Sequence, residues 1–336
     1  MQRDPKEIKI YLSRILPAIG ADLLREQGFI VNIAENDEPR APSKLIEIAQ
    51  KHNALITVSG DKLDKSFLEK CRHLKIISQF AAGYDNIDLV EATRLGIPVC
   101  NTPDAMTEAT ADIAFGLMIA CSRKMFYMHK TIARNEWGHF RPTAHLGIEL
   151  KNKTVGIFGL GRIGMAMARR CKGAYDMKII YCNRQPNAEA EKNLDAQRVS
   201  FDQLLRESDV LSVHSVLSDD TRGIFDRAAF GKMKKSAIFI NTSRGSIHHE
   251  EDLIQALSSG QIWGAGLDVT NPEPMESNNP LLGMENVAVL PHIGSATVEA
   301  RNEMSRMAAR NIIEFYKTGI VPNLLNPEYL HIRRKT

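Results

Sequence analysis

With 336 residues, the chain is long enough for about two domains. Its 43% hydrophobic and 25% charged residues are typical of a globular protein. A net charge of +3 without blocks of like charge argues against a nucleic-acid partner, and no run is apolar enough for a membrane span or a signal peptide.

The five cysteines are scattered, without a CxxC pair or the spacing of a metal site. They are Cys71, Cys100, Cys121, Cys171 and Cys182. Reduced cysteines in apolar runs behave as small hydrophobic residues. We therefore expect a reducing, cytoplasmic setting and no bound metal.

The first hundred residues alternate between strand-like and helix-like segments. We expect strands at 8–12, 29–33, 54–58, 75–80 and 97–100. Helix-like segments lie between them at 17–28, 42–52 and 87–96. This alternation is typical of βαβ units and a mostly parallel sheet.

A long helix is expected next, with Thr102 as its N-cap and Pro103 at its first position. Its segment ADIAFGLMIA is strongly apolar, so we expect this helix to be buried where two domains join.

The alternation then restarts, with strands expected at 154–158, 178–182, 210–214, 237–241, 265–269 and 287–290. A final helix is expected from about Thr297 to Thr318, ending at Gly319 in a left-handed C-cap. The pattern predicts an α/β protein with two doubly wound parallel sheets. We expect domains at 1–102 and 103–296, with 297–336 returning to the first.

A glycine-rich turn lies between the strand at 154–158 and a helix, in TVGIFGLGRIGMAMARR. Gly159 permits a tight turn, Gly161 lets backbone approach a pyrophosphate, and Gly164 lets helix and strand pack closely. The free N–H groups of the helix N-terminus favour a diphosphate. This context favours a dinucleotide site over an unliganded turn or another nucleotide site, such as that of a methyltransferase.

The next strand ends in YCNRQ, with Asn183 and Arg184 where NAD sites usually have a carboxylate. A carboxylate would repel a 2′-phosphate, whereas an arginine beside an asparagine can hydrogen-bond it. The sequence therefore favours NADP(H), with NAD(H) as the other candidate and a solvated Arg184 as the alternative interpretation.

Three more strands of the second half are followed by reactive side chains, Arg244, Glu273 and His292. Ligands of open α/β sheets lie beyond the carboxyl ends of the strands. A histidinium is a suitable general acid, a carboxylate orients it, and an arginine can hold a carboxylate with two hydrogen bonds. Together these groups fit the reduction of a 2-oxoacid to a 2-hydroxyacid.

These motifs resemble the D-isomer-specific 2-hydroxyacid dehydrogenase family along nearly the whole chain. The matching stretches are IFGLGRIG, INTSRG, GLDVTNPEP and LPHIGSAT. Within the family, NRQP, AIFINTSRG and NNPLLGMENVAVLPHIGSATVEARNEM are most similar to glyoxylate/hydroxypyruvate reductases. The resemblance implies a Rossmann-type cofactor domain inserted in a smaller flavodoxin-like, substrate-binding domain.

The resemblance also implies roles for individual residues. Arg244 would bind the substrate carboxylate and carbonyl, and His292, partnered by Glu273, would be the general acid/base. The N–H groups of Ala82 and Gly83 would bind the substrate carboxylate, with a simple tight turn as the alternative. Cofactor contacts would come from Thr107, Gly159, Leu160, Gly161, Arg162, Ile163, Gly164, Asn183, Arg184, Val216, Thr221, Thr242, Asp268, His292 and Gly294, with Asp268 bonding the nicotinamide amide.

One segment departs from the mammalian-type reductases, whose partner subunit covers the substrate with a tryptophan-rich loop. NEWGHFRPTAHLG keeps Trp137 but has Phe140 where another tryptophan is expected, which leaves the choice between hydroxypyruvate and glyoxylate open. The segment and the preceding helix resemble the dimerisation arm of the family, so we expect a homodimer.

Two other functions fit the same motifs. One is a dehydrogenase for 3-phosphoglycerate, 2-ketogluconate or 4-phosphoerythronate, and for phosphorylated substrates Arg14 is the only obvious extra basic residue in the first domain. The other is a non-catalytic NAD(H)-sensing protein like the corepressors that share this fold. Turnover of NADPH with glyoxylate separates the two classes.

Overall fold

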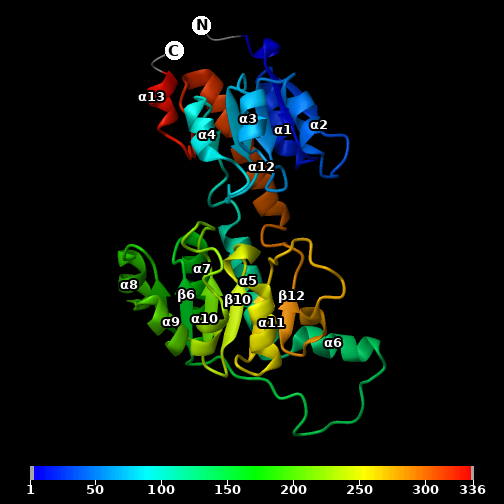
Figure 1. The fold of residues 1–336 in the computed structure, drawn as a ribbon, viewed down its shortest axis with the longest axis vertical. Helices are drawn as coiled ribbons and strands as arrows, with labels where there is room; N and C mark the ends of the chain where they lie inside the picture. The colour runs from blue at the N-terminus through cyan, green and yellow to red at the C-terminus, as the bar shows by residue number, and fades with distance from the viewer. Residues whose placement is uncertain (1–3, 334–336) are drawn as a thin grey trace. The chain divides into compact units, whose positions relative to one another are not determined.

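Two parallel sheets organise the chain in the computed structural model, which describes residues 4–333. The chain divides into a first unit, which runs up to Met106 and resumes at Ala296, and a second unit, Thr107–Ser295 (Figure 1). Each unit has its own sheet and its own buried core.

The sheet of the first unit has five strands in the order β2-β1-β3-β4-β5, all parallel. The strands are β1 Lys9–Leu12, β2 Ile30–Ile33, β3 Ala54–Thr57, β4 Ile76–Gln79 and β5 Val99–Cys100. The helices are α1 Ala18–Glu26, α2 Pro42–Ala49, α3 Lys65–Lys70, α4 Leu89–Arg94, α12 Val298–Thr318 and α13 Tyr329–Arg333, with a 3-10 helix at Pro5–Glu7. This strand order is flavodoxin-like, as expected.

Helices cover both faces of this sheet. On one face, α1 and α12 bury Leu24 and Ile312 against the strands. On the other face, α2, α3 and α4 bury Leu45, Phe67 and Ala92. Because both faces are covered, the central strands β3 and β4 are buried along their whole length instead of alternating between buried and exposed residues.

The helix α12 begins and ends as the sequence predicts. The Thr297 side chain accepts a hydrogen bond from the Ala300 N–H at 3.1 Å, and Gly319 follows the last turn with a left-handed φ of 75°. The helix packs so closely on α1 that a Cβ at Gly20 would lie only 2.4 Å from the Ser305 carbonyl oxygen. This close packing holds the C-terminal segment in the first unit.

The sheet of the second unit has seven parallel strands in the order β12-β11-β10-β9-β6-β7-β8. The strands are β6 Thr154–Phe158, β7 Lys178–Cys182, β8 Gln197–Arg198, β9 Val210–Val213, β10 Ile238–Asn241, β11 Gly264–Leu267 and β12 Val287–Val289. The helices are α5 Thr107–Ser122, α6 Met125–Ala133, α7 Arg162–Tyr175, α8 Ala188–Leu194, α9 Phe201–Glu207, α10 Arg227–Lys232 and α11 Glu250–Ser258, with 3-10 helices at Gly245–Ile247 and Pro280–Gly283. The order reverses between β6 and β9, as in Rossmann folds.

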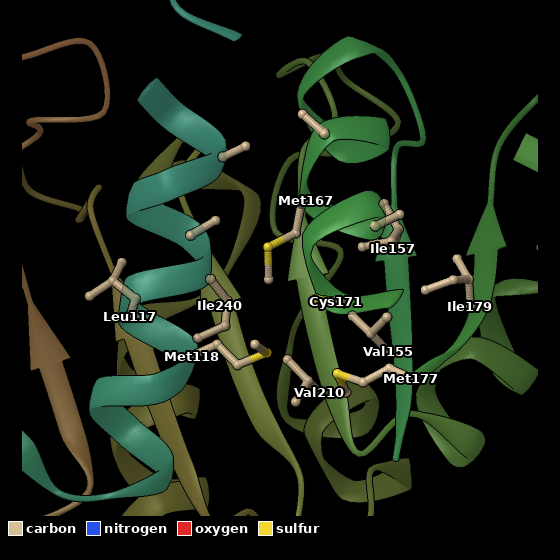
Figure 2. Close-up of a cluster of buried hydrophobic side chains, with 14 of the residues drawn as sticks. Leu117, Met118, Val155, Ile157, Met167, Cys171, Met177, Ile179, Val210 and Ile240 are labelled. Carbon is tan, nitrogen blue, oxygen red and sulfur yellow. The ribbon is translucent and has the colours of Figure 1, made fainter. Parts of the chain in front are cut away.

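The helices α5 and α7 lie side by side over one face of this sheet (Figure 2). Leu117, Met118 and Met167 pack there against Val155 and Ile240. The opposite face is covered by α9, α10 and α11. The doubly wound architecture expected from the sequence is therefore confirmed, and α5 is buried as its apolar segment predicts.

The start of α5 differs from the expectation. The helix begins at Thr107, so the prediction of Thr102 as N-cap and Pro103 as first residue is wrong. Asp104 adopts a φ of 69°, which lies outside the α-helical region, and the Ala105 N–H bonds the Pro103 carbonyl at 2.9 Å. A non-helical turn therefore precedes the helix.

All five cysteines are free thiols, and four of them are buried. Burial raises the pKa of Cys100, Cys121 and Cys171 to about 12, so these thiols are structural and poorly reactive. In the part of the chain that the structure describes, no helix has the length and apolar character to cross a membrane.

Candidate active site

The glycine-rich turn joins β6 to α7. Gly159 has a φ of 94°, and a Cβ there would lie 2.6 Å from the Ser215 nitrogen. A Cβ at Gly164 would lie 2.6 Å from the Gly159 carbonyl oxygen, so the first turn of α7 packs directly on the preceding turn. Gly161 is exposed, and within residues 4–333 a Cβ there would meet nothing closer than 4 Å. These positions have the geometry of a dinucleotide-binding turn, with open backbone at a helix N-terminus.

The end of β7 lies against this turn. The Asn183 Oδ1 accepts a hydrogen bond from the Leu160 N–H at 2.6 Å, and its Nδ2 donates to the Leu160 carbonyl at 3.3 Å. Arg184, the next residue, is exposed. The amide of Asn183 therefore joins β7 to the glycine-rich turn, and Arg184 is the member of the pair that faces solvent.

The segments after β9 and β10 bring further expected cofactor residues to the same edge of the sheet. Val216 is 60% exposed, and the Thr221 hydroxyl donates to its carbonyl at 2.8 Å and accepts from the Ser218 N–H at 2.8 Å. Thr242 is buried, and its hydroxyl has no hydrogen-bond partner among the described residues. This edge thus offers an exposed apolar side chain and an unpartnered hydroxyl.

Arg244 follows β10 in a turn that Asn241 holds. The Asn241 Nδ2 donates to the Arg244 carbonyl at 2.9 Å and bonds the His248 Nδ1 at 3.1 Å, while its Oδ1 accepts from the Ser243 N–H at 3.0 Å. Burial lowers the pKa of His248 to about 4, so its ring is neutral and can accept this bond. The half-buried Arg244 is thereby presented by a rigid turn.

Glu273 and His292 form a direct pair. The His292 Nδ1 lies 2.5 Å from the Glu273 Oε1, and the two side chains are 41% and 42% exposed. Partial burial acts to raise the pKa of Glu273, but the hydrogen bond and charge of His292 outweigh it, with help from the Thr270 backbone and Arg244, so the pKa lies below its usual value. His292 therefore has one nitrogen fixed by a carboxylate and the other available for chemistry.

The side chain of Asp268 holds the turn that carries His292. This buried carboxylate accepts hydrogen bonds from the Ile293 N–H at 2.8 Å and the Gly294 N–H at 2.7 Å. Burial raises the pKa of Asp268, and the two backbone donors act against that rise. The Thr110 hydroxyl bonds the Gly294 carbonyl at 3.1 Å. Asp268 thus orients the histidine turn, a role that the sequence did not indicate.

The turns of Arg244 and Glu273 are packed on each other. A Cβ at Gly245 would lie 1.9 Å from the Thr270 carbonyl oxygen, so only glycine allows this approach. The Thr270 hydroxyl in turn donates to the Pro272 carbonyl at 2.8 Å, next to Glu273. Arginine, glutamate and histidine therefore follow neighbouring strands at the carboxyl edge of one sheet.

The remaining expected cofactor residues lie in the second unit at or near α5 and α7. They are the half-buried Thr107 at the start of α5, the buried Leu160, the exposed Arg162 and the half-buried Ile163.

The first unit carries Ala82 and Gly83 after β4. Their carbonyls accept from Asn101 Nδ2 at 2.7 Å and from Gln79 Nε2 at 3.3 Å. Their N–H groups donate to no other group of residues 4–333. The carbonyls are thus held by protein, whereas the two donors are left for another acceptor.

The segment after α6 exposes large apolar side chains. Trp137 is 79% exposed and Phe140 is 87% exposed, and Ile132 at the end of α6 is 55% exposed.

Comparison with known proteins identifies the family. Residues 115–294 match the model of the D-isomer specific 2-hydroxyacid dehydrogenase NAD-binding domain. A glyoxylate reductase from Thermococcus litoralis is 43% identical over 96% of this chain and 98% of its own length.

Solved structures of similar proteins support the same family. A glyoxylate reductase from Paecilomyes thermophila superposes with a TM-score of 0.85 at 31% identity, covering 96% of this chain and 98% of the other. An NADPH-dependent glyoxylate/hydroxypyruvate reductase from Sinorhizobium meliloti, in complex with NADP and malonate, gives 0.83 at 29% identity, covering 96% and 97%. The chain therefore belongs to the D-isomer-specific 2-hydroxyacid dehydrogenase family and is an oxidoreductase.

Proposed function

We propose that the protein reduces a small 2-oxoacid, glyoxylate or hydroxypyruvate, to the D-2-hydroxyacid with a reduced nicotinamide cofactor. The observation that carries this proposal is the His292–Glu273 pair, 2.5 Å apart, at the sheet edge where the glycine-rich turn lies. The glyoxylate reductases at 38–43% identity support the substrate class.

The cofactor fits the second unit. Gly161 leaves open backbone at the N-terminus of α7, and Thr242 has a buried hydroxyl without a partner among the described residues. We propose NADP(H), because Arg184 stands exposed where NAD sites carry a carboxylate. Asn183 supports this site by fixing the turn, and Val216 and Thr221 border it. When bound, the reduced nicotinamide supplies the hydride to the carbonyl carbon.

His292 supplies the proton in this proposal. With Nδ1 on the Glu273 carboxylate, the protonated ring donates the proton on Nε2 to the carbonyl oxygen as the new carbon–hydrogen bond forms. The products are the hydroxyl group and a neutral imidazole, which takes a proton from water before the next turnover. Glu273 stabilises the charged ring and fixes its orientation.

Arg244 binds the substrate carboxylate and polarises the carbonyl, since a guanidinium can make two parallel hydrogen bonds to such a group. Ala82 and Gly83 offer backbone N–H donors that suit a carboxylate, and we assign them to substrate binding.

We also propose a homodimer. The exposed Ile132, Trp137 and Phe140 form an apolar segment of the kind that marks an interaction site in a soluble protein. Light scattering of the purified protein tests this directly, and a monomeric mass would reject it.

A panel of small 2-oxoacids, each with NADPH and with NADH, tests the function. We expect rapid loss of nicotinamide absorbance with glyoxylate or hydroxypyruvate. No turnover with any 2-oxoacid, despite cofactor binding, would instead favour a nucleotide-sensing protein. A phosphorylated substrate is disfavoured, because Arg14 is buried and lies 2.9 Å from the Asp61 carboxylate, which neutralises its charge.

A further inference from the structure

We propose that Arg184 and Arg198 together bind the 2′-phosphate of NADP(H), and that Arg198 is the second cation of this site. The inference rests on the proposed function and adds a specificity-determining residue that no motif in the sequence indicates. Arg198 lies on β8, the edge strand that pairs in parallel with β7, with Tyr181 opposite Arg198 in the register.

The Arg198 guanidinium reaches the carboxyl end of β7. Its Nε donates to the Asn183 carbonyl at 3.1 Å and its Nη2 donates to the Arg184 carbonyl at 2.7 Å. A guanidinium has five N–H donors, so these two bonds leave others for a ligand. Arg198 therefore fixes the backbone of Arg184 and brings its own charge to the same place.

The amide of Asn183 is held by the glycine-rich turn. Both of its polar atoms bond the Leu160 backbone, and Asn187 Nδ2 donates to the same Leu160 carbonyl at 3.0 Å. Asn183 thus contributes a fixed, uncharged support that does not repel a phosphate. Recognition of the phosphate falls to the neighbouring guanidinium groups.

The charge at this edge is not neutralised. Neither Arg184 nor Arg198 has an ion pair with any carboxylate of residues 4–333. The two acidic residues of α8 are engaged elsewhere: Glu189 pairs with Arg169 at 2.6 Å, and Glu191 accepts a hydrogen bond from the Tyr181 hydroxyl. Two unpaired guanidinium groups suit a phosphate, which carries nearly two negative charges near neutral pH.

Binding of adenosine 2′,5′-bisphosphate and of 5′-AMP, measured by calorimetry, isolates the 2′-phosphate from the nicotinamide chemistry. We expect the wild-type protein to bind the bisphosphate at least about tenfold more tightly, the contribution of one or two charge-assisted hydrogen bonds. Arg198→Ala is expected to reduce this preference to below about threefold, with 5′-AMP affinity unchanged within about twofold. Arg227→Ala, an exposed arginine on α10, is the matched control and should change neither affinity.

An unchanged preference in Arg198→Ala would overturn the proposal, and so would an equal loss of 5′-AMP binding, because that pattern indicates a structural role. The wild-type protein gives an independent measure. Added salt should weaken the binding of the bisphosphate more steeply than the binding of 5′-AMP, and an equal salt dependence of the two affinities would contradict the proposal. Absence of binding to both probes and of all turnover would refute the proposed function itself. Turnover with equal binding of both probes would refute only the arginine pair.

Discussion

The pair formed by Glu273 and His292 allows a quantitative test through Glu273→Gln. The change keeps the shape of the side chain but removes the negative charge that accepts the hydrogen bond from His292. The protonated ring, which is the form that donates the proton, therefore loses its charged partner.

The magnitude follows from the geometry. A hydrogen bond between charged groups contributes about 1.5–3 kcal/mol. The two side chains are 41% and 42% exposed, so solvent screening reduces this to about 1–1.5 kcal/mol. Because about 1.4 kcal/mol corresponds to tenfold in rate, we expect kcat/KM near neutral pH to fall roughly tenfold.

The pH–rate profile of glyoxylate reduction measures this effect. In Glu273→Gln kcat/KM near neutral pH should fall roughly tenfold, while the melting temperature stays close to that of the wild type. Glu276→Gln, which alters an exposed carboxylate of the same loop, should leave the profile in place. A profile for Glu273→Gln that coincides with the wild type would refute the role of this carboxylate.

Three further changes test the support of the site. Gly245→Ala places a Cβ 1.9 Å from the Thr270 carbonyl oxygen, so we expect unfolding free energy to fall by about 3 kcal/mol or more in chemical denaturation. Asp268→Asn replaces one carboxylate oxygen by an NH2 group, which then faces the backbone N–H of Ile293 or Gly294. We expect the unfolding free energy to fall by about 1–3 kcal/mol and kcat to fall as well. The pKa of His248 is about 6.5 in the unfolded chain and about 4 in the folded protein, so between these pH values only the unfolded state binds the proton. As the pH falls from 6.5 to 4, the unfolding free energy of the wild type should therefore decrease by about 3 kcal/mol more than that of His248→Gln.

Each change has a control and a contradicting result. Gly231→Ala, where no atom lies within 4 Å, should be neutral, and equal effects of the two glycine changes would remove the packing argument. Full activity and stability in Asp268→Asn would show that the histidine turn does not depend on this anchor. Parallel pH–stability curves for the wild type and His248→Gln would mean that this ring is not held neutral.

The strands and the positions of the candidate site residues could be predicted from the sequence because their signals are local. Buried parallel strands are short apolar runs, so the strand limits of β6 and β7 match the expected ranges. Arg244, Glu273 and His292 follow such runs, and parallel strands bring their carboxyl ends to one edge. The glycine spacing likewise reports a turn that needs no distant information.

Other features depend on contacts that no local pattern encodes. The short helix α3 is capped by Asp64, which accepts the Phe67 N–H, but six residues give little periodicity. The role of Asp268 depends on a turn 25 residues later in the chain. In the sequence, nothing distinguishes Arg198 from other surface arginines. Only the pairing of β8 with β7 places it beside Arg184.

The central claim is that His292 delivers the proton to the substrate carbonyl. The most direct measurement is single-turnover reduction of glyoxylate by NADPH with His292→Ala, under conditions where cofactor binding is saturated. The account predicts that the chemical step slows by about 10²–10⁴-fold while NADPH affinity is retained. A step that proceeds at the wild-type rate would contradict it, because the proton would then come from another group.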